Sequence, residues 1–173
     1  MLEVKDDMGS EYTKRFAFQK ILGIFTHGCN YKLEKIMTKS YKPNNLPDLI
    51  PYLIVKDANK SLDFYTKAFG FEIVNKMEEE GKLQHVEMRK NDIVIMFCPE
   101  GAMGMNTKAP VTKGVEESIS LYCYVEDVDA FYANAIKHGA RSDMPPDDRF
   151  WGDRMCALTD HDGYKWSFAT YNG

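Results

Sequence analysis

The chain has 173 residues, of which 44% are hydrophobic and 28% charged, so it can bury a core and is not disordered as a whole. No stretch approaches the roughly 20 apolar residues of a membrane-spanning helix, and a net charge of −4 argues against general nucleic-acid binding. We therefore expect neither a membrane nor a nucleic acid as a partner. Residues 1–46 hold 8 basic and 5 acidic side chains, whereas residues 47–173 hold 14 and 21. The sequence thus divides into a weakly basic N-terminal extension, 1–46, and an acidic domain, 47–173.

The extension contains one helical pattern. The spacing of a single helical face is followed by Phe18, Ile21, Leu22 and Phe25. Acidic residues before this pattern and the lack of a small-residue cleavage site after it argue against a secretory signal. We interpret the extension as an accessory helix or a loosely ordered segment. A membrane-surface helix and a natural start of synthesis at Met37 are the alternatives.

The four cysteines show no close spacing such as CxxC; they are Cys29, Cys98, Cys123 and Cys156. A secreted scaffold held by disulfides would be shorter and richer in cysteine. We therefore expect reduced thiols and a cytoplasmic location, although four cysteines are enough for two bridges.

The acidic domain contains an internal repeat. The first copy opens with PYLIVKD (51–57) and the second with LYCYVED (121–127), so that Asp57 and Asp127 are 70 residues apart. Each opening segment predicts a strand followed by a helix, with the aspartate as the N-cap. The two helices are expected to end at Gly70 and Gly139.

Three more strands are predicted after each helix. They are expected at 71–76, 83–89 and 93–97 in the first copy, and at 140–142, 154–159 and 164–170 in the second. An Asp-Gly pair at 162–163 predicts a hairpin, and the two prolines at 145–146 predict a loop. Each copy is therefore a βαβββ unit of an α+β fold. The expected limits are module one at 48–98, a linker at 99–118 and module two at 119–171.

Two strings carry a resemblance to a known family: PYLIVKDANKSLDFYTKAFGFE, which opens the first copy, and FWGDRMCALTDHDGYKW (150–166) in the second. With the doubled βαβββ pattern, they resemble the vicinal oxygen chelate superfamily, in its glyoxalase/bleomycin-resistance-like branch. The resemblance covers about residues 48–171 and implies a fold also known as dihydroxybiphenyl dioxygenase-like. It also implies pairing of modules within or between chains, and we expect a homodimer with two equivalent clefts. Because this fold hosts several chemistries, the resemblance does not define an activity.

Enzymes of this superfamily commonly hold a divalent metal with His and Glu. The resemblance places the corresponding positions at Ile50, Ile95, Ser120 and Ser167. None of these side chains offers the imidazole or carboxylate that such an ion requires. We therefore expect the family metal site to be absent and expect no cofactor. A relocated site would need His85 with Glu87, or His161, whose position in a hairpin favours a turn instead.

Strand alternation assigns one face of each predicted sheet to a concave surface. On the first strands this face holds Ile50, Tyr52 and Ile54, and Ser120, Tyr122 and Tyr124. The closing strands add Ile93, Ile95 and Phe97, and Lys165, Ser167 and Ala169. The predicted ligand-binding residues are Tyr52, Ile54, Tyr122, Tyr124, Trp151, Lys165 and Trp166. Such an aromatic surface on an acidic domain favours a small aromatic or cationic ligand; alternatively, the tyrosines belong to the core and the acidity serves solubility.

The leading interpretation is a small-molecule-binding protein of the glyoxalase/bleomycin-resistance type that sequesters its ligand in a cleft between βαβββ modules. One alternative is a metal-free lyase or isomerase in which Glu87 or His85 transfers a proton, provided that these side chains face the cavity rather than an outer edge. Another is a glyoxalase-like or dioxygenase-like metal enzyme with relocated ligands. Whether the protein is an enzyme stays open, since no nucleophile elbow, P-loop or dinucleotide motif is present.

Overall fold

The computed structural model describes residues 40–173. The helical face predicted at 18–25 and the alternative start at Met37 lie outside the described residues. No helix in the described part of the chain is long and apolar enough to cross a membrane.

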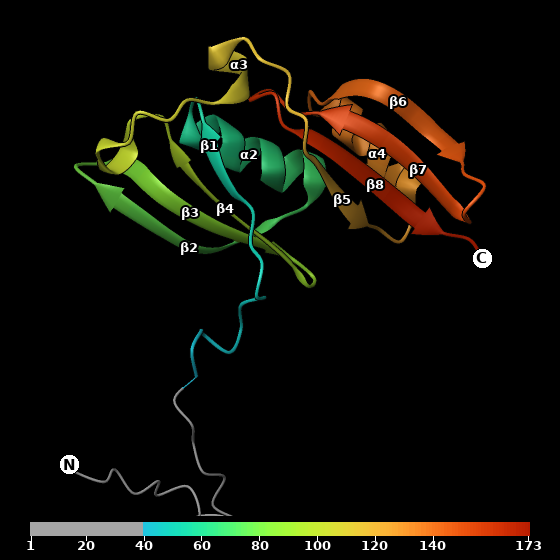
Figure 1. Ribbon diagram of the computed structural model, residues 1–173, viewed down its shortest axis with the longest axis horizontal. Helices are drawn as coiled ribbons and strands as arrows, with labels where there is room; N and C mark the ends of the chain where they lie inside the picture. The colour runs from blue at the N-terminus through green and yellow to red at the C-terminus, as the bar shows by residue number, and fades with distance from the viewer. Residues whose placement is uncertain (1–39) are drawn as a thin grey trace, which may run out of the picture. The chain divides into compact units, whose positions relative to one another are not determined.

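The described residues form two four-stranded β-sheets, each accompanied by one longer helix (Figure 1). The first unit consists of β1 (Tyr52–Val55), α2 (Ala58–Phe69), β2 (Glu72–Glu79), β3 (Lys82–Lys90) and β4 (Ile93–Pro99). The second consists of β5 (Ser120–Tyr124), α4 (Val128–Lys137), β6 (Arg141–Asp148), β7 (Asp153–Thr159) and β8 (Lys165–Tyr171). Two short helices, η1 (Ala102–Gly104) and α3 (Pro110–Lys113), lie between the units. The predicted α+β fold with two βαβββ modules is therefore confirmed.

Both sheets have the same topology. Their strand orders are β1-β4-β3-β2 and β5-β8-β7-β6, and in each the first strand is parallel to the last while the other neighbours are antiparallel. Tyr52 pairs with Met96 in the first sheet, and Tyr122 pairs with Ser167 in the second. The sequence repeat is therefore also a repeat in three dimensions.

The helix boundaries follow from their caps. The Asp57 carboxylate accepts hydrogen bonds from the backbone N–H groups of Asn59 and Lys60, and the Asp127 carboxylate accepts one from Ala130. Helix α2 ends at Gly70, whose φ of 73° is the left-handed conformation that glycine adopts without strain. Helix α4 ends one residue earlier than predicted, with His138 as its C-cap instead of Gly139.

Strand β6 is longer than predicted. It runs from Arg141 to Asp148 and includes both prolines that indicated a loop. The strand lies at the edge of its sheet, and its pairing with β7 shifts register between Ser142 and Met144 and again between Met144 and Asp147. An irregular edge strand tolerates proline because some of its backbone N–H groups need no partner.

A single hydrophobic core joins the two modules. Helices α2 and α4 pack against each other, and the inner faces of both sheets contribute to the same cluster of buried side chains. At the end of α2, the Phe69 ring lies with its centroid 5.0 to 5.9 Å from those of Tyr65, Phe131, Trp166 and Phe168. Each sheet therefore turns one face to this shared core and leaves its other face open.

Candidate functional site

Two open sheet faces carry most of the residues that the sequence singles out. Leu53 and Val86 pack into the core, so their neighbours in the strands, Tyr52, His85 and Glu87, lie on the other side of the first sheet. We call this side the first open face; it holds Tyr52, Ile54, His85, Glu87, Met96 and Cys98. The second open face holds Ser120, Tyr122, Tyr124, Asp153, Met155, Lys165 and Ser167.

The face assignment predicted for β4 is wrong. Ile95 and Phe97 are buried in the core instead of lining the concave surface. The cause is the spacing of the repeat: Tyr52 and Tyr122 are 70 residues apart, whereas their partners on the closing strands, Met96 and Ser167, are 71 residues apart. Since the side-chain period of a strand is two, a shift of one residue exchanges the faces. The structural counterpart of Ser167 is Met96, and not Ile95.

The family metal positions do not fit a divalent ion. With the corrected register they are Ile50, Met96, Ser120 and Ser167, none of which supplies an imidazole or a carboxylate. The hydroxyls of Ser120 and Ser167 lie 2.9 Å apart and bond to each other. Within residues 40–173, no group of three or more His, Cys, Asp or Glu side chains is arranged to hold a metal.

A short chain of polar contacts crosses the first open face. The Tyr52 hydroxyl lies 2.8 Å from His85 Nδ1, the two rings stack with centroids 5.5 Å apart, and His85 Nε2 lies 3.4 Å from Glu87 Oε1. The side chains of His85 and Glu87 are each less than a fifth exposed. Burial, with a smaller effect of Cys98, raises the pKa of Tyr52 to about 12. The tyrosine is therefore protonated at neutral pH, and the imidazole is positioned between a hydroxyl and a carboxylate.

The second open face is organised around one carboxylate. Asp153 Oδ2 accepts hydrogen bonds from the Tyr122 hydroxyl at 2.6 Å, from Trp151 Nε1 at 3.0 Å and from the Tyr124 hydroxyl at 3.2 Å. The aspartate is 4% exposed, whereas the three aromatic side chains are about half exposed. These hydrogen bonds, that of Tyr122 foremost, hold the pKa of Asp153 below its usual range. We call Tyr122, Tyr124, Trp151 and Asp153 the aromatic cluster.

A glycine turn brings Trp151 back over this carboxylate. The Gly152 N–H donates to the Arg149 carbonyl at 3.0 Å, and Gly152 has a φ of 95°. A Cβ atom at Gly152 would lie 3.1 Å from the Tyr171 ring, so a larger residue would be strained and crowded there. Sequence reasoning missed Asp153, although alternation along β7 from Met155 would have placed it on the face of Tyr122 and Tyr124.

Three other predicted ligand-binding residues have different surroundings. Trp166 is 1% exposed in the core, with its Nε1 donating to Asp160 Oδ2 at 2.9 Å, so it lines neither open face. Lys165 lies on the second open face but pairs with Glu116. The backbone N–H and carbonyl of Ile54 both bond to the Tyr164 hydroxyl at 2.9 Å.

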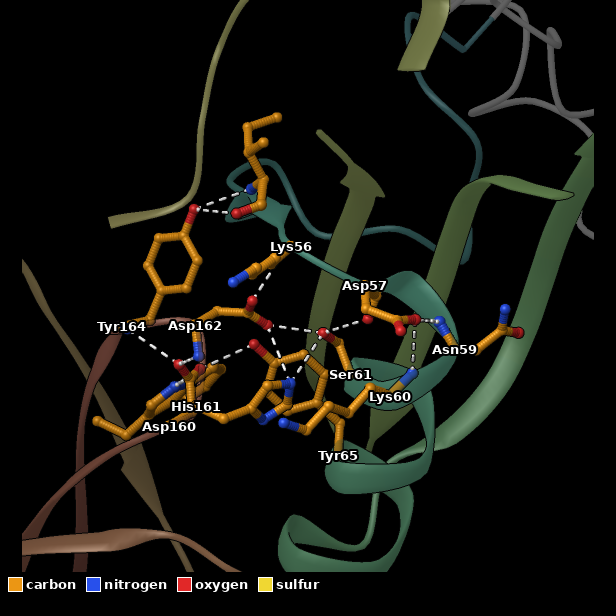
Figure 2. A network of polar contacts seen from close by, with 12 residues as sticks. Lys56, Asp57, Asn59, Lys60, Ser61, Tyr65, Asp160, His161, Asp162 and Tyr164 are labelled. Carbon is orange, nitrogen blue, oxygen red and sulfur yellow. Dashed lines mark hydrogen bonds and ion pairs between the residues drawn. The ribbon is translucent and has the colours of Figure 1, made fainter. Parts of the chain in front are cut away.

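The hairpin that contains His161 anchors the second module on the first (Figure 2). Asp162 accepts from the Lys56 backbone N–H at 2.8 Å and from the Ser61 hydroxyl at 2.6 Å. His161 Nε2 lies 3.2 Å from Ser61 Oγ and 3.2 Å from Asp162 Oδ2. Ser61 has no solvent-exposed surface, so a substrate cannot reach its hydroxyl. This serine, histidine and aspartate therefore hold the modules together and do not form a nucleophilic site.

Asp160 makes the second half of this anchor. Its Oδ2 accepts from the Tyr65 hydroxyl at 2.8 Å and from Trp166, and its Oδ1 accepts from the backbone N–H groups of Asp162 and Tyr164. Burial raises the pKa of Asp160 despite these hydrogen bonds.

A groove of about 520 Å³ lies between the modules. It is lined by Gly70, Glu72, Arg89, Lys90, Asn91, Val125, Glu126, Asp127 and Phe131. None of the predicted site residues lines it. Its charges are mixed, and Lys90 Nζ already lies 5.4 Å from the centroid of the Phe131 ring. The candidate functional side chains lie on the open faces and not in this groove.

Comparisons with known proteins match this architecture. Residues 48–168 match the family model of the Glyoxalase/Bleomycin resistance protein/Dioxygenase superfamily. An uncharacterised protein of Mycobacterium bovis is 33% identical over 124 residues, covering 70% of this chain and 81% of that protein. The crystal structure of TioX from Micromonospora sp. ML1 has a TM-score of 0.59 at 22% identity, covering 71% of this chain and 97% of TioX. TnmS3, an antibiotic-binding protein from Streptomyces sp. CB03234, has a TM-score of 0.53 at 19% identity, covering 70% and 93%. At these identities, the two solved structures establish a shared fold only.

Proposed function

The chain belongs to the Glyoxalase/Bleomycin resistance protein/Dioxygenase superfamily, and from this premise we propose that it binds and sequesters a small aromatic or cationic molecule on its open sheet faces. The observation that carries the proposal is the aromatic cluster, whose three large rings are about half exposed yet held in place by hydrogen bonds. Fixed aromatic surface of this kind favours flat ligands, because little side-chain freedom is lost on binding. The antibiotic-binding activity of TnmS3, which shares the fold, is compatible with this role.

We further propose that the binding cleft forms between two copies of the chain. Both open faces turn away from the shared core, so a single chain does not place them around one cleft. The edge strands β2 and β6 also leave backbone groups unpaired, which favours association with another chain. A homodimer would bring an open face of one copy opposite an open face of the other. Light scattering should give twice the mass of the chain at micromolar concentration; a single-chain mass would contradict the homodimer.

A thermal-shift screen of aromatic amines, neutral aromatics and aromatic acids tests ligand binding. A compound at 100 times its Kd should stabilise the protein by about 2.7 kcal/mol. Tyr124→Ala should reduce the shift because it removes one ring of the aromatic cluster, whereas Tyr41→Ala, an exposed tyrosine outside both faces, should retain it. If no compound stabilises the wild type, or if both variants respond as the wild type does, the proposal is wrong.

The chain of contacts from Tyr52 through His85 to Glu87 favours a second function, a metal-free lyase or isomerase. In this function Glu87 would remove a proton from a carbon next to a carbonyl group, and the Tyr52 hydroxyl would donate to the developing oxyanion. Carbonyl compounds incubated in D₂O should then exchange that hydrogen for deuterium, as observed by NMR. Glu87→Gln should abolish the exchange, and Glu79→Gln at the exposed end of β2 should not. Exchange no faster than the buffer rate would exclude this function.

We also propose that the protein works in a reducing compartment, as in the cytoplasm. Cys98, Cys123 and Cys156 are all buried as free thiols. Burial raises the pKa of Cys123 and of Cys156 to about 11, which keeps these thiols protonated and unreactive. Mass spectrometry of protein alkylated in denaturant, directly after rapid lysis, should find all three unpaired; a disulfide among them would contradict the proposal.

A further inference from the structure

The Asp153 carboxylate carries a negative charge without a basic partner in the described part of the chain. All three of its side-chain donors are neutral groups, and all three bond to the same oxygen, Oδ2. The basic residues near it in sequence are engaged elsewhere: Arg149 pairs with Asp147, and Arg154 pairs with Asp129 and Asp148.

The other oxygen of this carboxylate, Oδ1, accepts no hydrogen bond from residues 40–173 and stays accessible to a ligand, although the residue as a whole is only 4% exposed. A nearly buried carboxylate normally has a cationic partner or is protonated. Here the phenol and indole donors keep it ionised, since they lower its pKa. Three aromatic side chains surround the carboxylate and leave the residue only 4% exposed, so its charge is less screened by solvent than that of an open surface carboxylate.

The surroundings match one class of ligand group. The rings of Tyr122, Tyr124 and Trp151 present electron-rich faces, and Phe150 packs edge-on to Trp151 with centroids 4.8 Å apart. A substituted ammonium ion is attracted both by such faces and by a carboxylate beneath them. An anionic group would be repelled by Asp153. A divalent metal would find a single carboxylate among neutral phenols, which is too few anionic ligands.

We propose that the aromatic cluster is a receptor for an organic cation, with Asp153 as its counter-ion. The inference rests on the proposed small-molecule function and narrows it to ligands with a quaternary or protonated amine attached to a flat or apolar body. The charged group of the ligand binds to the second open face. The rest of the ligand contacts the open face of the other copy, which lies opposite in the proposed homodimer.

The two tryptophans of the chain supply a site-specific probe. In ¹H–¹⁵N spectra each indole N–H gives one signal; the Trp151 N–H donates to Asp153, whereas the Trp166 N–H donates to Asp160 in the core. The indole signal that disappears in Trp151→Phe belongs to Trp151, and the signal that remains belongs to Trp166. Titration of the full chain with benzyltrimethylammonium should shift the Trp151 signal in a saturable way and leave that of Trp166 in place. Phenylmethanesulfonate, which has the same benzyl group and the opposite charge, should not shift it at the same concentrations, and benzyl alcohol should bind more weakly than the cation.

A charge-removing variant completes the test. Asp153→Asn retains an acceptor oxygen and should weaken binding of benzyltrimethylammonium about tenfold or more. Asp92→Asn makes the same change in net charge at an exposed turn residue, and it should change the affinity for benzyltrimethylammonium less than about twofold. Equal shifts of Trp151 by cation and sulfonate in the wild type would overturn the cation receptor, as would unchanged affinity in Asp153→Asn. If none of the three probes shifts Trp151, the receptor is also excluded, and the thermal screen then decides separately on the small-molecule function. The comparison of probes uses the wild type, so the test holds even if Asp153→Asn does not fold.

Discussion

Tyr52 and Tyr122 occupy equivalent positions in the two modules but bond to different groups. The Tyr52 hydroxyl lies 2.8 Å from His85 Nδ1, whereas the Tyr122 hydroxyl donates to Asp153 Oδ2 at 2.6 Å. Burial raises the pKa of both tyrosines to about 12. The repeated backbone thus places an imidazole beside the tyrosine of the first open face and a carboxylate beside the tyrosine of the second. A cleft that combined the two faces would be chemically asymmetric, with one wall suited to proton transfer and the other to a cation.

The first prediction concerns the pH dependence of stability. Hydrogen bonds from Tyr122 and its neighbours hold the pKa of folded Asp153 below the ordinary value of 3.8, to which it returns on unfolding. A depressed pKa contributes stability that is present above 3.8 and is lost as the pH falls through the folded pKa. Asp153→Asn should therefore be less stable than the wild type at pH 7, and the difference should shrink below about pH 4.

Urea unfolding of both proteins between about pH 7 and pH 2.5 measures this difference. Asp92→Asn is the control, because it makes the same change of net charge at an exposed turn residue. A destabilisation of Asp153→Asn that stays constant or grows in acid would show that the carboxylate is not stabilised by its aromatic donors.

Most of the fold could be predicted from the sequence because its signals are local. Asp57 and Asp127 cap helices through hydrogen bonds to N–H groups two or three residues away. Alternation along β1 and β5 correctly separated core from open face, and the offset of 70 residues revealed the repeat. Where the strands are irregular, as in β6 around its prolines, the local pattern indicated a loop although pairing with β7 makes a strand.

The candidate site was harder to predict because it depends on register and on contacts between strands. The closing strands are offset by 71 residues and the first strands by 70, and this difference of one residue exchanges the faces of Ile95 and Met96. Asp153 belongs to the string 150–166 that carries the family resemblance. Its role, however, depends on side chains of β5, which is about 30 residues earlier in the chain. Trp166 was expected at the ligand, but the alternation that gives Lys165 and Ser167 the open face places it on the core side, where its Nε1 donates to Asp160.

The second prediction tests the shared core. Phe69→Ala removes a ring that contacts aromatic residues of both modules and should lower the free energy of unfolding by about 3–5 kcal/mol. Phe150→Ala is the matched control, since Phe150 is 98% exposed and its loss should change stability by less than about 0.5 kcal/mol. Chemical denaturation followed by tryptophan fluorescence and by circular dichroism should give one common transition in each protein. Two separate transitions in the wild type would contradict a core common to both modules.

The third prediction concerns the anchor between the modules. Ser61→Ala removes the donor to Asp162 Oδ2 and leaves a buried carboxylate with one hydrogen bond fewer, so the free energy of unfolding should fall by about 1–3 kcal/mol. Ser118→Ala, at an exposed serine before β5, should have an effect below about 0.5 kcal/mol. Urea midpoints at pH 7 provide the measurement. Equal stability of the two variants would mean that the contact between Ser61 and Asp162 is not a stabilising anchor.

The fourth prediction is that metal removal leaves the protein unchanged. The positions that hold a divalent ion elsewhere in the superfamily are here Ile50, Met96, Ser120 and Ser167. Neither an aliphatic side chain, a thioether nor a pair of neutral hydroxyls replaces imidazole and carboxylate as ligands of such an ion. Treatment with EDTA should therefore alter neither the melting temperature nor the affinity for benzyltrimethylammonium. Protein dialysed against manganese, zinc, nickel or iron and then against buffer should retain much less than one metal per chain in elemental analysis. A stoichiometric metal with micromolar affinity would contradict the assignment, and loss of that metal in His85→Ala would locate it on the first open face.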